Sequence, residues 1–321
     1  MRSFKSVLVT GGAGFIGSTL VRKLLDRSDV ERLVVLDALT YAGDRRNLAG
    51  TDQDPRFHFV EGSINDTELV QRLLKKAGVT GIFHLAAESH VDRSIVDPSS
   101  FVHTNVGGTS CLLDCARLAK IPLLICSTDE VYGSAPVHVS FSESGPLNPS
   151  SPYSASKAAA DLLALAAVTT YQQDLVIARC TNNYGPRQHR EKLVPHFIYK
   201  ALRDEALPLY GSGQQIRDWI HVEDCALGLI AAYERGTRGN IYHIGAGSES
   251  TNLGIARRLL KVLHKPEALI SHVADRPGHD MRYALNVSRS FQILGWKARI
   301  PFRTGFSEVV RELAAALRPT D

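Results

Sequence analysis

The feature that most constrains the fold is a glycine-rich loop that joins an apolar run to a helical pattern near the start of the chain. Residues 6–10 are Ser-Val-Leu-Val-Thr, which is typical of a buried strand. Gly12, Gly14 and Gly17 then have the G-x-G-x-x-G spacing, and Gly11 with the last two has the spacing G-x-x-G-x-x-G. Such glycines allow a sharp turn and bring backbone N–H groups close to a pyrophosphate. The loop therefore predicts an α/β sheet that binds a dinucleotide.

An acidic residue at the end of the second predicted strand indicates which dinucleotide is bound. The apolar run 33–36 ends in Asp37, twenty residues after Gly17. A carboxylate at this position accepts hydrogen bonds from the ribose hydroxyls of the adenosine and repels a 2′-phosphate. The sequence therefore predicts NAD as the cofactor, in preference to NADP.

The rest of the first half alternates short apolar runs with helical patterns. Strands are expected over 57–60, 81–85, 121–127 and 174–179, and long helices over 100–119 and 153–171. This alternation implies parallel strands, whereas Pro and Gly become frequent after about residue 182. We predict an α/β fold with a Rossmann-type doubly wound parallel sheet over 1–182, to which 220–245 return. A smaller C-terminal substrate-binding lobe is expected over 183–321.

Two short stretches carry residues suited to acid–base chemistry. Tyr153 and Lys157 would share one face of a helix, and the ammonium would favour the charged form of the phenol, so that Tyr153 could act as a base near neutral pH. Thr128, Asp129 and Glu130 follow an apolar run and offer an acid and a base. Tyr-x-x-x-Lys also occurs by chance, and two adjacent acids also occur in solvated loops. The dinucleotide loop in the same chain favours the catalytic interpretation.

Composition excludes several other classes of function. The net charge is +4 with scattered Lys and Arg, and no long basic run suggests nucleic acid. No apolar stretch approaches the roughly 18 residues of a membrane span, and the N-terminus has no signal-peptide layout. The five cysteines are odd in number and lie mostly in apolar segments, so that free thiols, a cytoplasmic location and no metal site are expected.

With these motifs in place, the chain resembles the extended short-chain dehydrogenase/reductase superfamily, and within it the nucleotide-sugar 4,6-dehydratases. Similar stretches are 37–43, 84–92, 179–186, 191–195, 216–219 and 274–280, so the similarity covers roughly residues 6–296. The Thr-Asp-Glu triplet is the most specific of the motifs, because epimerases and decarboxylases of the superfamily usually lack it. A UDP-sugar 4,6-dehydratase, a UDP-sugar 4-epimerase and a non-catalytic NAD-binding sensor remain as alternatives.

The resemblance implies NAD-dependent dehydration of a nucleotide-diphosphate sugar, with dTDP-glucose expected. Tyr153 would take the proton of the C4 hydroxyl while hydride leaves C4, and Thr128 would hydrogen-bond that oxygen. The C4 ketone acidifies the C5 hydrogen, which Glu130 would remove. Asp129 would protonate the departing C6 hydroxide before hydride returns to C6. The product would be a 4-keto-6-deoxy sugar.

The resemblance also implies the other site residues. The expected cofactor contacts are Gly11, Gly14, Phe15, Ile16, Gly17, Asp37, Ala38, Leu39, Thr40, Ser63, Ile64, Leu85, Ala86, Ala87, Ser89, Thr104, Tyr153, Lys157 and Asn183. The expected substrate contacts are Ser89, Thr128, Asn182, Lys192, Leu193, Pro208, Tyr210, Arg217, Asn252, Arg276 and His279, with the two arginines on the diphosphate. Ser63 stands where the family usually has an aspartate that contacts adenine. The helices at 100–119 and 153–171 resemble those that pair subunits, so a homodimer is expected.

Overall fold

The computed structural model describes residues 2–317, and a seven-stranded parallel sheet forms its centre. The strand order is β10-β6-β5-β4-β1-β2-β3. The strands are β1 (Ser6–Thr10), β2 (Arg32–Asp37), β3 (Phe57–Glu61), β4 (Gly81–His84), β5 (Leu123–Thr128), β6 (Leu175–Cys180) and β10 (Ile241–Ile244). The order reverses between β1 and β4, where an open α/β sheet forms a crevice at the carboxyl ends of its strands. The predicted doubly wound sheet is confirmed.

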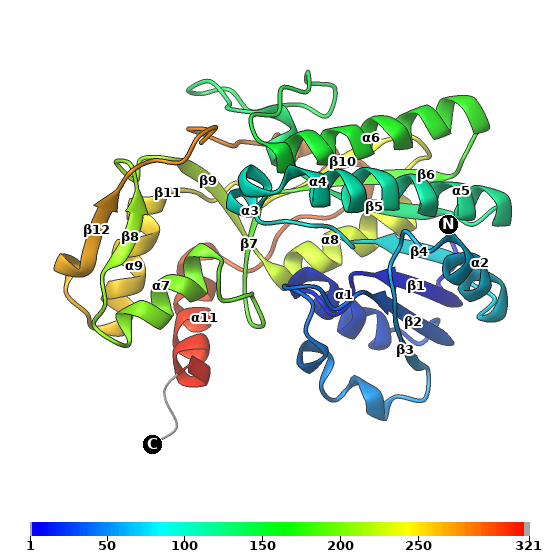
Figure 1. The fold of residues 1–321 in the computed structure, drawn as a ribbon, viewed down its shortest axis with the longest axis horizontal. Helices are drawn as coiled ribbons and strands as arrows, with labels where there is room; N and C mark the ends of the chain where they lie inside the picture. The colour runs from blue at the N-terminus through cyan, green and yellow to red at the C-terminus, as the bar shows by residue number, and fades with distance from the viewer. Residues whose placement is uncertain (1, 318–321) are drawn as a thin grey trace.

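Helices cover both faces of this sheet (Figure 1). On one face α1 (Phe15–Leu25) packs against α8 (Val222–Arg235), and on the other α5 (Thr109–Ala119) packs between α2 (Thr67–Lys76) and α6 (Pro152–Tyr171). Two apolar cores result, one on each face. Central strands such as β1 and β6 are buried along their whole length, which explains their continuous apolar runs.

A smaller lobe follows β6 and lies at the left of Figure 1. It contains a three-stranded sheet of β7 (Asn182–Tyr184), β9 (Ile216–His221) and β11 (Glu249–Thr251), and a two-stranded sheet of β8 (Leu207–Tyr210) and β12 (Ile270–Val273). The helices α7 (Leu193–Ala201), α9 (Asn252–Leu263) and α11 (Phe302–Leu317) enclose a third apolar core. Within this half of the chain, β10 pairs with β6 of the main sheet.

The expectation of one continuous helix over 100–119 is wrong. The chain forms α4 (Pro98–Phe101), a π-helical segment Val102–Gly108, and then α5. Asn105 in the π-helical segment donates to Ser156 Oγ at 2.9 Å and to the Glu88 carbonyl at 3.0 Å, and so ties this wide turn to α6 and to the segment after β4. Such turns often mark functional sites, and this one places Thr104 at the cavity described below.

Two further short α-helices are α3 (Val91–Val96) after β4 and α10 (Ser288–Leu294) against β10 and α8. Within residues 2–317 no helix has both the length and the apolar character that crossing a membrane requires.

Candidate active site

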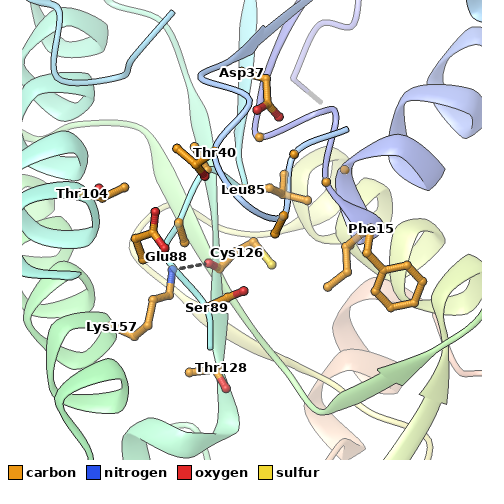
Figure 2. Close-up of a pocket in the computed structure, with 18 of the residues that line it drawn as sticks. Phe15, Asp37, Thr40, Leu85, Glu88, Ser89, Thr104, Cys126, Thr128 and Lys157 are labelled. Carbon is orange, nitrogen blue, oxygen red and sulfur yellow. Dashed lines mark hydrogen bonds between the residues drawn. The ribbon is translucent and has the colours of Figure 1, made fainter. Parts of the chain in front are cut away.

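A cavity of about 500 Å³ lies at the carboxyl ends of the central strands and collects most of the predicted cofactor residues (Figure 2). The predicted residues that line it are Gly11, Gly14, Phe15, Ile16, Gly17, Asp37, Ala38, Thr40, Ser63, Ile64, Leu85, Ala86, Ala87, Ser89, Thr104, Thr128, Asp129, Glu130, Tyr153, Lys157, Asn182, Asn183 and Lys192. The volume falls within the range of cofactor and ligand sites in enzymes. The strand order places these dispersed motifs around one cavity.

The glycine loop forms a cradle that has no room for side chains. Gly11 has φ +70°, and a Cβ atom there would lie 2.6 Å from the Ala86 nitrogen. A Cβ atom on Gly17 would collide with the Gly11 carbonyl oxygen. Gly14 precedes α1 and has no side chain to cap it, so the first N–H groups of the helix remain available. This cradle fits the pyrophosphate of a dinucleotide.

Asp37 is fixed at the end of β2 by two backbone donors. Its carboxylate accepts from Ala13 N at 2.8 Å and from Leu39 N at 2.9 Å. Burial raises the pKa of Asp37, and these two N–H groups oppose that shift. Four lone-pair directions are available to a carboxylate, so two donors leave capacity for ribose hydroxyls. Leu39 itself adopts φ +48° beside the carboxylate and is not among the lining residues.

The Thr128-Asp129-Glu130 segment forms a tight turn directly after β5. Thr128 Oγ1 accepts from Glu130 N at 3.3 Å and lies 3.1 Å from Asp129 Oδ1, to which its hydroxyl donates. Asp129 is 3% exposed, and its Oδ2 atom is buried without a hydrogen-bond partner among the described residues. The turn thus holds two carboxyl groups at the cavity at the end of the same strand.

The two carboxyl groups lie in different electrostatic environments. Burial and the neighbouring Glu130 raise the pKa of Asp129 well above its ordinary value. Burial also raises the pKa of Glu130, but Arg276, Arg217 and Lys192 oppose that rise. The two environments therefore differ: burial and Glu130 favour the protonated form of Asp129, whereas three nearby cations favour the charged form of Glu130. Paired carboxyl groups whose pKa values are separated in this way can serve as acid and base.

Tyr153 and Lys157 lie on the first turns of α6 and both line the cavity. A capping box between Ser151 and Ser154 fixes the start of this helix. The prediction of a lowered Tyr153 pKa is wrong, since the pKa of this phenol is raised. Burial raises the pKa of Tyr153 well above its ordinary value, because the ring is buried and faces Glu130. Lys157 Nζ instead donates to the Cys126 carbonyl at 2.8 Å (Figure 2).

The predicted substrate residues divide into two groups. Ser89, Thr128, Asn182 and Lys192 line the cavity, whereas Leu193, Pro208, Tyr210, Arg217, Asn252, Arg276 and His279 do not. Lys192 Nζ donates to the Ser89 carbonyl at 2.8 Å and so joins the lobe to the segment after β4.

Residues of the second group are held by other parts of the protein. Arg276 Nη1 lies 3.4 Å from Asp92 Oδ1, and the Tyr210 hydroxyl donates to Asp92 Oδ2 at 3.0 Å. His279 Nδ1 lies 2.6 Å from Asp275 Oδ1. Arg217 donates to the Asp280 carbonyl at 2.9 Å. Arg276 and Arg217 both lower the pKa of Glu130, which indicates that their charges act on the Asp129–Glu130 turn.

Several site residues escaped prediction. The cavity is also lined by Leu36, Ala42, Gly43, Gly62, Asn65, His103, Cys126, Ser127, Cys180, Thr181, Gln188 and His189. Most of them directly neighbour predicted residues, so extension along each motif would have found them. Tyr283 is different, because its hydroxyl donates to Asp280 Oδ2 at 2.9 Å and lies 3.4 Å from Glu130 Oε2. The only sequence signal for Tyr283 is that it lies three residues after Asp280, the last residue of the 274–280 stretch.

Within residues 2–317 no cluster of three or more His, Cys, Asp or Glu side chains is arranged to hold a metal ion. The residues that line the cavity offer carboxyl, phenol, ammonium and backbone N–H groups.

Comparison with known proteins identifies relatives over nearly the whole chain. Residues 8–309 match the family described as GDP-mannose 4,6 dehydratase. A dTDP-glucose 4,6-dehydratase of Actinoplanes sp. is 47% identical, and the match covers 95% of this chain and 96% of the relative. A low-salt glycan biosynthesis protein of Haloferax volcanii is 49% identical over 95% of this chain and 97% of its own. The crystal structure of DesIV, a dTDP-glucose 4,6-dehydratase of Streptomyces venezuelae with NAD bound, superposes with a TM-score of 0.93 at 48% identity and covers 95% of this chain and 96% of its own.

Proposed function

The chain belongs to the family of NAD-dependent nucleotide-sugar 4,6-dehydratases, and on that basis we propose that it is a lyase that converts dTDP-glucose to dTDP-4-keto-6-deoxyglucose. The observation that carries the proposal is that buried Asp129 and half-buried Glu130 line the same cavity as Tyr153. A 4-epimerase needs only the tyrosine, the lysine and a ketone that can rotate. Two carboxyl groups in contrasting environments are what elimination of water requires.

The residues of the cavity are suited to the successive proton transfers. NAD, when bound, supplies the nicotinamide that accepts hydride from C4 and later returns it to C6. Tyr153 takes the proton of the C4 hydroxyl, and Thr128 hydrogen-bonds the same oxygen. Glu130 then removes the C5 hydrogen, which the C4 ketone has made acidic. Asp129 gives its proton to the C6 oxygen, so that water and not hydroxide leaves. Removal of the C5 hydrogen needs a charged carboxylate, and protonation of the C6 oxygen needs a protonated carboxyl. The environments of Glu130 and of Asp129, respectively, suit these two needs.

The raised pKa of Tyr153 has to be opposed when this phenol acts as a base. Three anionic or polar neighbours raise this pKa together with burial, and Glu130 is the first of them. A cationic nicotinamide close to the phenol would act in the opposite direction. Lys157, one helical turn beyond Tyr153, would then hold the cofactor and the phenol together through its ammonium. Tyr153 is therefore proposed as a base that is fully active only in the NAD complex.

The cations of the smaller lobe are proposed to bind the nucleotide diphosphate. Arg217 and Arg276 carry guanidinium groups that suit a diphosphate, and Arg276 Nε is buried with no partner among the described residues. Residues 1–182, with 220–245 returning to the sheet, are proposed as the NAD-binding domain, and 183–321 mostly as the nucleotide-sugar-binding lobe. The five free cysteines support a cytoplasmic location.

A homodimer is proposed through the helices beside the sheet. Val102, Leu118, Leu162 and Tyr171 are exposed apolar residues on the π-helical segment, α5 and α6. Exposed apolar groups on adjacent helices are typical of a subunit interface. Light scattering tests this point, because a mass near 35.1 kDa would contradict the dimer.

The assignment is tested by supplying dTDP-glucose and UDP-glucose to the purified protein with NAD. Turnover of dTDP-glucose with loss of one water and no net NADH is expected, whereas UDP-glucose should react slowly or not at all. A Glu130→Gln variant should still oxidise C4 but eliminate water about 100-fold more slowly, so that NADH accumulates. The exposed carboxylate Glu68 on α2 provides a control, since Glu68→Gln should leave both steps unchanged. Full product yield from Glu130→Gln would refute the proposed base.

A further inference from the structure

Beneath the two catalytic segments lies a chain of four buried polar side chains that the proposed reaction does not use. Each of the four is at most 1% exposed, and they are Arg179 on β6, Asp161 on α6, Tyr132 at the end of the catalytic turn and His243 on β10. Arg179 Nε donates to Asp161 Oδ2 at 2.8 Å, and Arg179 Nη1 donates to the Tyr132 hydroxyl at 2.5 Å. Tyr132 and His243 are joined at 2.7 Å. Four elements distant in sequence therefore meet in one hydrogen-bonded chain.

The hydrogen bonds and the burial of His243 together set one direction. A guanidinium has no acceptor, so the Tyr132 oxygen accepts from Arg179. Burial lowers the pKa of His243 to about 3, so its ring is neutral and carries one proton. That proton lies on Nδ1, which faces the Asn286 carbonyl 2.9 Å away and donates to it, so Nε2 accepts the hydroxyl proton of Tyr132. His243 is neutral and fixed in one tautomer, and the orientation of the phenol is fixed with it.

These hydrogen-bonded side chains connect the Asp129–Glu130 turn with the helix that carries Tyr153 and Lys157. Tyr132 lies two residues after Glu130 in the same tight turn, and this turn has no other side-chain hydrogen bond to β6 or β10 among the described residues. Asp161 lies one helical turn after Lys157 on α6. Arg179 lies at the centre and bridges the turn to the helix.

We propose that Tyr132, Arg179, Asp161 and His243 form a positioning network that holds the Asp129–Glu130 turn in register with the Tyr153–Lys157 helix. The inference rests on the proposed function, since it assigns the network to the elimination step of that reaction. Catalytic groups must be held to within a fraction of an ångström, and a displacement of about 1 Å can cost roughly 100-fold in rate. A buried ion pair rarely adds stability over apolar packing, but it can specify one arrangement. Here the specified arrangement is that of the acid and base relative to the tyrosine.

The proposal is tested by replacing Tyr132 with Phe in the NAD-bound enzyme. The substitution removes one oxygen and loosens the turn from β6 and β10, so elimination should slow by roughly 10- to 100-fold. C4 oxidation should continue, and NADH should therefore accumulate during turnover, with the KM for dTDP-glucose within about twofold of its original value. Tyr242→Phe is the matched control, because Tyr242 is also buried on β10 and its hydroxyl accepts from Thr237 N outside the network. This control should accumulate no NADH.

A second pair of variants keeps the test decisive if Tyr132→Phe fails to fold. His243→Gln can still accept from Tyr132 and donate to the Asn286 carbonyl, and should keep elimination within about threefold of the original rate. His243→Leu can do neither and should accumulate NADH as Tyr132→Phe does. Nitrogen NMR of the cofactor-free protein should further show His243 neutral and protonated on Nδ1.

The outcomes separate this inference from the proposed function. If the unmodified enzyme does not turn over dTDP-glucose, the proposed function fails. If it does, but Tyr132→Phe and His243→Leu slow both steps equally without NADH accumulation, the network is only structural and the inference is overturned. A protonated His243, or a proton on Nε2, would also overturn it.

Discussion

The two halves of the site differ in how their polar groups are occupied. In the cofactor half, the glycine cradle and the end of β2 present N–H groups and a carboxylate to an open cavity. In the substrate half, Arg276, Tyr210 and His279 are held by Asp92 and Asp275 and do not line that cavity. The cofactor half is preformed by backbone geometry, whereas the substrate half consists of side chains that are paired with carboxylates of the protein.

This difference follows from what each half is made of. A turn that only glycine fits has one shape whether or not a ligand is bound. Long side chains such as those of Arg276 and Tyr210 can reach several partners, and both contact the same carboxylate, Asp92. A variant that acts on one half should therefore leave binding to the other half intact, and four experiments test that separation.

The largest effect is expected from Gly17→Ala in the cofactor half. The new Cβ would collide with the Gly11 carbonyl and lie 2.8 Å from the Gly12 Cα, and both are backbone atoms that cannot move aside. NAD affinity should fall by more than about 100-fold, because the cradle no longer closes around the pyrophosphate. Fluorescence or calorimetric titration with NAD measures the loss. Circular dichroism must show the same fold, and tight NAD binding in a folded variant would mean that the cradle is not the cofactor site.

Arg276→Ala is the complementary change in the substrate half. It should raise the KM for dTDP-glucose roughly 10- to 100-fold, since a charge-assisted contact to the diphosphate is lost, and leave the Kd for NAD unchanged. Arg257 on α9 offers a control, because it is an exposed arginine of the same lobe that pairs with Glu267. Arg257→Ala should change neither constant. A loss of NAD affinity in Arg276→Ala would show that the two halves are coupled and would break the comparison.

A third experiment follows the catalytic pair, which lies between the halves, as a function of pH. Glu130 must be ionised to act as base, and its pKa is raised, so kcat/KM should decline as the pH falls through that raised value. Asp129 must be protonated, and its pKa is raised further, so the rate should also decline as the pH rises through it. Each limb should approach about tenfold per pH unit. An acid limb at or below the ordinary glutamate pKa of roughly 4.3 would contradict the assignment. Thermal midpoints measured at each pH serve as the control that the protein is folded throughout.

Much of the cofactor half could be predicted from the sequence because its determinants are local. The glycine spacing, the strand before it and Asp37 lie within one β-α-β unit, and each physical requirement concerns neighbouring residues. The substrate half depends on contacts between segments far apart in the chain. Tyr283, 153 residues after Glu130, and Asp92, 184 residues before Arg276, could not be paired by any local pattern.

The same distinction explains the two predictions that were wrong. The periodicity of 100–119 correctly indicated helix, but the widening at Val102–Gly108 arises where Asn105 bonds to Ser156 and Glu88, and these contacts are not local. The spacing of Tyr153 and Lys157 correctly placed both residues at the cavity. It could not reveal that burial and Glu130 raise the pKa of the phenol, because burial is a property of the assembled fold.

The smallest effect is expected from Ser63→Asp, which strengthens the half that is already preformed. Ser63 lines the cofactor cavity, and its Oγ accepts from Asn65 N at 3.1 Å. An aspartate can keep that bond and add a charge-assisted acceptor for the adenine amino group, which should lower the Kd for NAD about 3- to 10-fold. Ser63→Ala is the control and should leave the Kd nearly unchanged. If Ser63→Asp instead weakened NAD binding, the adenine would have to lie elsewhere, and the preformed part of the site would end at the pyrophosphate and the ribose. Ser63 lines the cofactor cavity whereas Arg217 and Arg276 do not, so the KM for dTDP-glucose should remain constant in either case.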